Sequence, residues 1–203
     1  MKIICVGRNY IDHAKELNNP IPKTPVLFLK PETAIIPKKN PFFLPDFSDD
    51  VHFEAELVIK INKLGKNIQK KFAHKYYSQI TVGLDFTARD IQQKQKEKGL
   101  PWEISKAFDG SAGIGKFMNI SELKNPGNPS FHLLLNDKKL QATSAEEMIF
   151  SIDTLIAEIS KYFTLKIGDL IFTGTPAGVG KLNKDDQLKL YLEENEVLRL
   201  NVK

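Results

Sequence analysis

The sequence has one cysteine and no long apolar run. Because Cys5 is the only cysteine among the 203 residues, no internal disulfide can form, and we expect a buried structural thiol in a reducing compartment. No apolar stretch approaches the roughly 18 residues that a membrane-spanning helix needs. The N-terminus MKIICVGRNY lacks the charged start, long apolar run and small-residue cleavage site of a secretory signal peptide. These absences predict a cytoplasmic protein that does not have a membrane as a partner.

The sequence also carries little excess charge. The formal net charge is +4 and the lysines are scattered, which argues against nucleic acid as a partner. The small positive charge could attract anionic metabolites, or it could simply serve solubility. With 41% apolar and 27% charged residues, the composition is that of a globular protein, and we predict one domain over residues 1–203.

Short apolar runs rich in β-branched residues alternate with turn signals over most of the chain. We expect strands at residues 3–6, 25–29, 51–61, 80–84, 131–135, 138–142, 165–172, 188–192 and 197–202. Helices are expected at residues 10–17, 68–77, 87–98 and 148–163, an irregular loop at residues 37–50, and hairpin turns at Asn136-Asp137 and Glu194-Asn195. The many strands and few helices predict an α+β fold that is predominantly β, and argue against a doubly wound nucleotide-binding fold.

Two glutamates share one face of the predicted strand at residues 51–61. Glu54 and Glu56 are two residues apart, and side chains at that spacing leave a strand on the same side. Neighbouring carboxylates repel each other unless a cation or a proton lies between them. Taken alone, this pattern more often marks a solvated face of an edge strand than a metal site.

Asp85 shifts the balance toward a metal site. It ends the apolar run VGLD, and a carboxylate at the mouth of a buried strand needs a partner. Three carboxylates are oxygen ligands, which suit a hard cation such as Mg²⁺ or Mn²⁺ better than zinc. The alternative is that Asp85 caps the helix that follows, a role that Thr87 could also fill. Spacing alone leaves both interpretations open.

Six segments of the chain carry a family resemblance. In order, they are VGRNYIDHAKEL, PVLFLKPETAI, HFEAELVI, GLDFTARDIQ, KGLPWEISKAFDG and GDLIFTGTPAGVG. Together, from about residue 3 to residue 180, they resemble the motifs of the fumarylacetoacetate hydrolase family, in its short branch of acylpyruvases, oxaloacetate decarboxylases and 2-hydroxyhepta-2,4-diene-1,7-dioate isomerases. The resemblance implies a mixed β-sandwich or β-roll with a few short helices, assembled as a homodimer.

The resemblance also implies roles for individual residues. Glu54, Glu56 and Asp85 match the family's ligands of Mg²⁺, for which Mn²⁺ or Ca²⁺ can substitute. Residues 10–19 match a lid segment that carries an acid–base dyad. The other matches are a catalytic set of His13, Glu16 and Lys106, and a substrate-binding set of Gln92, Thr175 and Lys30. Arg89 and Asp90, by contrast, are expected to pair with each other or with the framework.

The activity that the resemblance implies is an Mg²⁺-dependent reaction of a small 2-oxo acid through a metal-bound enolate. Hydrolytic cleavage of a carbon–carbon bond in an acylpyruvate is the first expectation. Isomerisation or tautomerisation of a 2-hydroxy-dienedioate or oxaloacetate, and decarboxylation of oxaloacetate, are the alternatives within the family. A non-catalytic metabolite-binding protein is the alternative from outside it.

Overall fold

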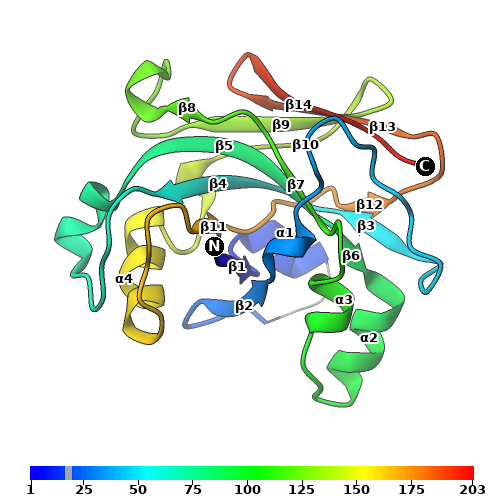
Figure 1. Ribbon diagram of the computed structural model, residues 1–203, viewed down its shortest axis with the longest axis horizontal. Coiled ribbons are helices and arrows are strands. Elements are labelled where there is room, and N and C mark those ends of the chain that lie inside the picture. The colour runs from blue at the N-terminus through cyan, green and yellow to red at the C-terminus, as the bar shows by residue number, and fades with distance from the viewer. Residues whose placement is uncertain (17–19) are drawn as a thin grey trace.

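The computed structural model describes residues 1–16 and 20–203 and is predominantly β (Figure 1). Its largest sheet has the order β2 (Val26–Lys30), β1 (Ile3–Gly7), β11 (Leu170–Phe172), β4 (Ala55–Ile61), β5 (Tyr77–Asp85) and β7 (Ala112–Ile114), with β8 (Met118–Asn119) paired to β5. A second sheet has the order β10 (Lys138–Ser144), β9 (Ser130–Leu135), β13 (Gln187–Leu192) and β14 (Asn195–Asn201). A third is formed by β12 (Gly180–Lys181), β3 (Val51–Phe53) and β6 (Thr87–Ala88). The expected α+β fold with a predominance of strands is confirmed.

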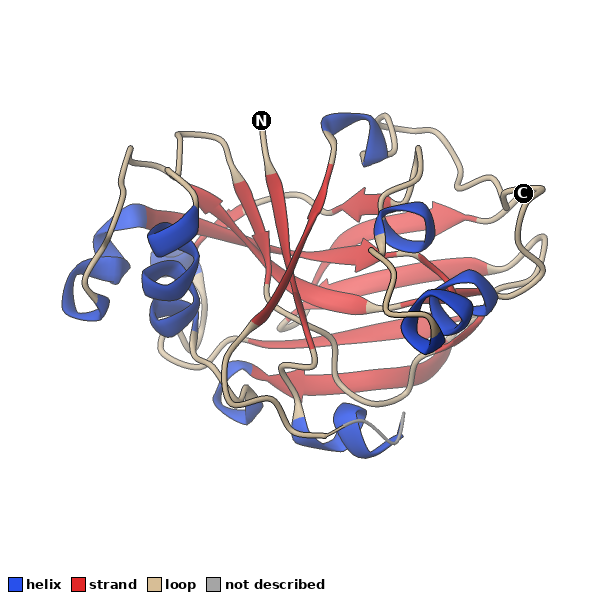
Figure 2. Ribbon diagram, turned by 90° about the horizontal axis from the view of Figure 1, so that it is seen from below, coloured by secondary structure: helices blue, strands red, loops and turns tan. Residues whose placement is uncertain are grey.

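Short helices lie around the strands, at the periphery of the molecule (Figure 2). The α-helices are α1 (Ile11–Glu16), α2 (Arg89–Glu97), α3 (Glu103–Lys106) and α4 (Ile152–Tyr162). Single 3₁₀ turns are η1 (Glu32–Ala34), η3 (Ile120–Glu122) and η4 (Ala145–Glu147), and a longer 3₁₀ helix is η2 (Lys70–Tyr76). Within the described residues, no helix is long and apolar enough to cross a membrane.

The core lies on both faces of the large sheet, because β4 is buried at every position but one and β5 is buried over its last six residues. On one face, residues such as Leu57 and Val82 pack toward the second sheet, which lies above β4 and β5 in Figure 1. On the other face, Cys5, Val58 and Phe172 form a smaller apolar cluster. The buried thiol that the sequence predicts is therefore part of this second cluster, and it is fully shielded from solvent.

The small cluster is next to the polar end of the sheet. Glu56 lies two residues before Val58 on β4, so both side chains leave the strand on the same face. Gly83 is paired with Glu56 across β4 and β5. A Cβ atom on Gly83 would lie 2.9 Å from the Phe172 ring and 2.8 Å from the Gly113 carbonyl oxygen, so only glycine fits. The missing side chain lets the strands approach one another beside the glutamate.

Several predicted boundaries differ from the observed ones. The strand expected at residues 51–61 is two strands, because the chain leaves the third sheet and joins the large one at Glu54. The helix expected from residue 148 begins at Ile152, where the Ser151 hydroxyl accepts a hydrogen bond from the Thr154 N–H. The strand expected at residues 165–172 begins only after a turn at Gly168, whose φ is +90°.

Smaller differences concern the other expected segments. The helix expected at residues 68–77 is the 3₁₀ helix η2. The helix expected at residues 10–17 is α1, and Leu17 falls outside the described residues. The hairpin turn at Asn136-Asp137 is confirmed, with positive φ at both residues. The other hairpin turn lies at Glu193-Glu194, one residue earlier than expected.

Candidate active site

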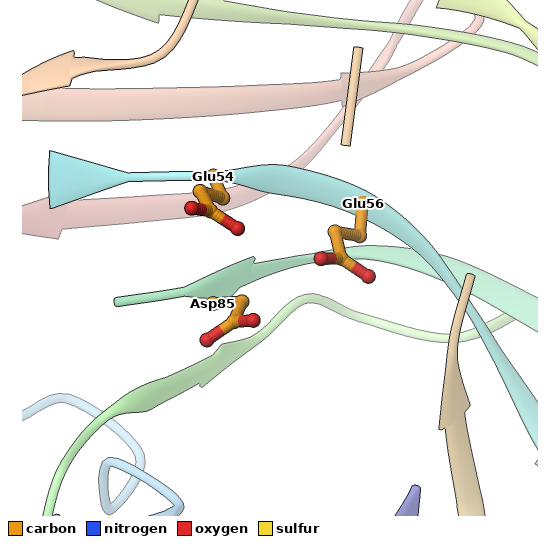
Figure 3. A group of neighbouring side chains, drawn as sticks. All are labelled: Glu54, Glu56 and Asp85. Carbon is orange, nitrogen blue, oxygen red and sulfur yellow. The ribbon is translucent and has the colours of Figure 1, made fainter. Parts of the chain in front are cut away.

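Three carboxylates converge where β4 begins and β5 ends (Figure 3). Glu54 lies at the break between β3 and β4, Glu56 lies on β4, and Asp85 is the last residue of β5. One oxygen of each lies within 4.8 Å of the others, and the three residues are at most 5% exposed. The alternative interpretation of Glu54 and Glu56, a solvated face of an edge strand, is therefore wrong. We call these three residues the carboxylate centre.

Backbone and side-chain donors hold the two glutamates of the carboxylate centre. The Gly174 N–H donates to Glu56 Oε2 at 2.6 Å. Gly174 has a φ of +99°, and a Cβ atom there would lie 2.6 Å from Asn9 Cβ, so this donor position requires glycine. The Thr87 hydroxyl donates to Glu54 Oε1 at 3.1 Å. Thr87 thus binds a ligand candidate rather than capping α2.

Lys106 lies between two members of the carboxylate centre. Its ammonium donates to Glu54 Oε2 and Asp85 Oδ2, each at 2.8 Å, and its side chain is buried. Burial lowers the pKa of Lys106, but the carboxylates of Asp85 and Glu54 outweigh this effect and raise its pKa above the usual value. Lys106 therefore stays charged.

The pKa values of the two glutamates are shifted in opposite directions. Burial raises the pKa of Glu54, but the positive charges of Lys106 and Arg89 outweigh it and hold that pKa well below its usual value. Burial, and then the negative charges of Asp85 and Glu54, raise the pKa of Glu56 well above its usual value. Lys106 opposes this shift only in part, and Glu56 is the member of the centre that forms no ion pair with any residue that the structure describes.

Asp85 has an oxygen that is buried without a hydrogen-bond donor among residues 1–16 and 20–203, namely Oδ1. The Lys30 ammonium lies 2.8 Å from this oxygen. However, Lys30 directs its hydrogen bonds to the Ser111 carbonyl and hydroxyl oxygens, at 3.0 Å each, and to the Lys106 carbonyl. A buried, all-oxygen donor set in which Glu56 forms no ion pair with any residue that the structure describes fits a hard divalent cation.

Lys30 itself does not reach the cleft that the carboxylate centre borders. Its side chain is fully buried, and it is not among the residues that line this cleft. The resemblance implies that Lys30 binds substrate, whereas the structure places its ammonium beside Asp85 and outside the lining of the cleft. This position suits a residue that holds Asp85 and the backbone around Lys106 and Ser111 in place.

His13, Gln92 and Thr175 line the cleft. His13 Nδ1 lies 3.1 Å from Glu16 Oε2, and the Gly178 N–H donates to Glu16 Oε1 at 3.0 Å. Burial lowers the pKa of His13, and the carboxylates of Glu54 and Glu16 oppose this shift only in part, so the imidazole is neutral near pH 7. Of the predicted lid at residues 10–19, residues 17–19 lie outside the described part of the chain.

Two further residues of the site were missed by sequence reasoning. Arg89, the first residue of α2, pairs with Glu54 and donates to Gln92 Oε1 at 2.7 Å, whereas Asp90 accepts from Ser48. The position of Arg89, four residues after Asp85, could have identified it as a site residue. Gln141 on β10 donates to Thr175 Oγ1 at 2.8 Å and accepts from the Ala55 N–H at 3.0 Å. Nothing in the hairpin pattern around Gln141 distinguishes it.

Comparison with known proteins adds three kinds of similarity. Residues 2–203 match the family model described as fumarylacetoacetate (FAA) hydrolase C-terminal. The chain is 42% identical over 201 residues to a mitochondrial oxaloacetate tautomerase of Caenorhabditis elegans, with 99% of this chain and 94% of that protein covered. It is 41% identical over 193 residues to an oxaloacetate tautomerase of Escherichia coli (strain K12), with 95% and 88% covered.

The fold is also similar to that of a solved enzyme. The crystal structure of fumarylpyruvate hydrolase from Pseudomonas aeruginosa in complex with Mn²⁺ and pyruvate superposes with a TM-score of 0.93. The two sequences are 34% identical, and the match covers 100% of this chain and 89% of that one.

Proposed function

The chain belongs to the fumarylacetoacetate hydrolase family, and we propose that it is a divalent-metal-dependent tautomerase that interconverts the keto and enol forms of a small 2-oxo acid of the oxaloacetate type. One observation carries the proposal. The buried carboxylate centre, the Lys106 ammonium and the neutral His13 imidazole border a single cleft. A cation site, a fixed positive charge and a base are what proton transfer next to a carbonyl group requires.

Glu54, Glu56 and Asp85 are the residues that would hold the cation. Their oxygen donors favour Mg²⁺ or Mn²⁺, and we propose Mg²⁺ as the native ion. When bound, the cation would supply a Lewis acid for the 2-oxo group of the substrate. It would also offset the repulsion that raises the pKa of Glu56.

His13 is the base in this proposal. Donation of the Nδ1 proton to Glu16 leaves the lone pair on Nε2, and the lowered pKa keeps that nitrogen unprotonated near pH 7. His13 Nε2 would accept a proton from C3 of the keto acid, and the electron pair of the broken C–H bond would form the C2=C3 double bond. The π electron pair of the carbonyl group would move onto the 2-oxo oxygen, and protonation of that oxygen by water would complete the enol. The Lys106 ammonium would stabilise the negative charge as it develops.

Gln92 and Thr175 would position the substrate carboxylate. Gln92 uses its amide oxygen to accept from Arg89, so its amide N–H groups remain to donate. Thr175 uses a lone pair to accept from Gln141, so its hydroxyl proton remains to donate. Both groups are thus fixed in a donor orientation, as the binding of an anion requires.

Hydrolysis of an acylpyruvate is the second candidate. The His13–Glu16 pair could equally remove a proton from a water molecule, and the fold resembles that of a fumarylpyruvate hydrolase. The sequence alone placed this reaction first. The two tautomerases, which are more similar in sequence than the hydrolase, favour the isomerase alternative.

Freshly dissolved oxaloacetate tests the proposal, because its enol form has an ultraviolet band that decays as the keto form accumulates. We expect the enzyme with Mg²⁺ or Mn²⁺ to accelerate this decay, and chelation or Glu56→Gln to remove the acceleration. Glu97→Gln, an exposed residue of α2, is the matched control. A parallel assay of pyruvate release from acetylpyruvate measures hydrolysis. Pyruvate release without any change in the oxaloacetate decay would reverse the order of the two candidates.

Three further expectations from the sequence are also part of the proposal. They are a single domain over residues 1–203, a homodimer and a cytoplasmic location. The name of the Caenorhabditis elegans relative places that protein in mitochondria. Light scattering after size-exclusion chromatography tests the dimer.

A further inference from the structure

The cleft carries more positive than negative charge. Four cationic side chains line it, namely Arg8, Arg89, Lys96 and Lys106. The three members of the carboxylate centre are the acidic residues of the lining. A divalent cation held by that centre would add two more positive charges, so the occupied cleft would have an excess of three. Such an excess favours a ligand with more than one negative charge.

Two of the four cationic side chains already have carboxylate partners. Arg89 pairs with Glu54, and Lys106 pairs with Glu54 and Asp85. Arg8 and Lys96 differ, since neither makes an ion pair or a side-chain hydrogen bond with any residue that the structure describes. Both are half-buried, so water satisfies them only in part.

Trp102, which also lines the cleft, lies next to both the Lys96 side chain and the backbone that precedes Arg8. The Lys96 ammonium lies 5.9 Å from the centre of the indole ring. A Cβ atom on Gly7, the residue before Arg8, would lie 3.5 Å from Trp102 Cζ3, so the indole packs directly on this turn of the backbone. Arg8 itself has a φ of +60°, a conformation that arginine rarely adopts and that the fold maintains at this position.

The surroundings of Lys96 in the cleft shift the pKa of its ammonium group. Burial, and then the positive charges of Arg89 and Arg8, lower the pKa of Lys96 to about 8. Arg8, Arg89 and Lys96 line the same cleft, and the two guanidinium groups repel the ammonium there. An anion bound between Arg8 and Lys96 would replace this repulsion with two attractive interactions.

We propose that Arg8 and Lys96 form a subsite for the second carboxylate of a 2-oxo dicarboxylate, and so select a dianionic over a monoanionic substrate. The inference rests on the proposed function, because it assumes that the first carboxylate and the 2-oxo group of the substrate lie at the carboxylate centre. It goes further by naming the residues that recognise the other end of the molecule. Arg8 and Lys96 act in specificity, and neither takes part in the proton transfer.

Paired ligands test the subsite by binding, without turnover. 2-Oxoglutarate and 2-oxopentanoate are five-carbon 2-oxo acids that differ in whether C5 is a carboxylate or a methyl group. Calorimetric titration in the presence of Mn²⁺ gives the ratio of their affinities for each variant. We expect a wild-type ratio of about 10 to 100 in favour of the dicarboxylate, as for charge-assisted hydrogen bonds. Lys96→Met and Arg8→Gln should each reduce this affinity ratio to a value close to one.

Controls separate this result from general damage to the cleft. Lys94→Met removes an exposed lysine from the same helix and should keep the wild-type ratio. Lys96→Arg restores the charge and should recover most of the preference. A wild-type ratio near one, or equal losses for both ligands in Lys96→Met, would overturn the subsite.

The subsite and the proposed function can fail separately. If the wild type accelerates the decay of the oxaloacetate enol but binds both ligands equally, the subsite is wrong and the tautomerase stands. If the ratio behaves as expected while the enol decay is unaffected, the subsite stands and the tautomerase is wrong.

Discussion

Glu56 should destabilise the metal-free protein, and the substitution Glu56→Gln reveals this cost. Burial and the charges of Asp85 and Glu54 raise the pKa of Glu56 well above its usual 4.5. A carboxyl group whose pKa is raised by folding favours the folded state below its unfolded pKa, and this benefit is lost as the pH rises toward the folded pKa. Glutamine has no charge to lose, and its amide oxygen can still accept from the Gly174 N–H.

The magnitude follows from proton linkage. Between pH 4.5 and the folded pKa of Glu56, the metal-free wild type loses stability relative to Glu56→Gln by up to about 1.4 kcal/mol for each pH unit. A bound divalent cation should make the wild type more stable than Glu56→Gln. At a free concentration of one hundred times Kd, Mg²⁺ or Mn²⁺ would add about 2.7 kcal/mol to the wild type, or roughly 5–10 °C in Tm for a chain of this length.

Urea denaturation from pH 4.5 to pH 8, with chelator and with Mg²⁺, measures both effects. We expect Glu56→Gln to be the more stable protein with chelator at neutral pH, and to gain almost nothing from Mg²⁺. Glu97→Gln should follow the wild type under both conditions, since Glu97 is exposed. A chelated Glu56→Gln variant that is less stable than the wild type at pH 8, or that gains as much from Mg²⁺, would refute the reasoning.

Further predictions concern His13, Lys30 and Gly174. His13→Ala should lower kcat/KM by about 10²- to 10⁴-fold in the enol assay while the stabilisation by Mn²⁺ persists; loss of that stabilisation would contradict the role of a base. Because the pKa of His13 is lowered, wild-type activity should decline only below about pH 6.5, and a decline that begins at a higher pH would exclude His13 as the titrating base. Lys30→Met should cost about 3–5 kcal/mol in urea denaturation, because it removes the buried ammonium beside Asp85; a loss below 1 kcal/mol would show that Lys30 does not support Asp85. Gly174→Ala should destabilise the protein by at least about 1–3 kcal/mol and weaken the stabilisation by Mn²⁺, since its Cβ would contact Asn9 at 2.6 Å. Gly168→Ala, at a similar φ but in open space, is the control and should leave the stabilisation by Mn²⁺ unchanged.

Local patterns in the sequence predict much of the fold. Alternating and β-branched runs identify most strands, and Asn136-Asp137 identifies its hairpin because both residues tolerate positive φ. The change of sheet at Glu54 is not predictable in this way. Both strands there alternate in the same phase, and only their distant partners differ.

The candidate site shows the same division. Glu54 and Glu56 can be placed on one face by their spacing, and their position beside Asp85 follows from the pairing of β4 and β5. The orientation of Lys30 cannot be predicted from the neighbouring residues in the sequence. It depends on the carbonyl groups of Lys106 and Ser111, more than 75 residues away. Gln141 belongs to a different sheet from the carboxylate centre, so only the tertiary structure brings it to Thr175.

The position of β11 in the large sheet has a consequence for the order of folding. In the hydrogen-bonded order of the large sheet, β11 lies between β1 and β4 and so links β1 and β2 to β4 and β5. Until residue 172 has been synthesised, the N-terminal strands form a two-stranded hairpin without its neighbour in the sheet, and a two-stranded hairpin alone is at best marginally stable in water. His13 follows that hairpin's first strand, whereas Glu56 and Asp85 belong to the β4–β5 pair. The strand that links the two walls of the cleft within the large sheet is therefore synthesised late, and a chain that ends before β11 would lack this link.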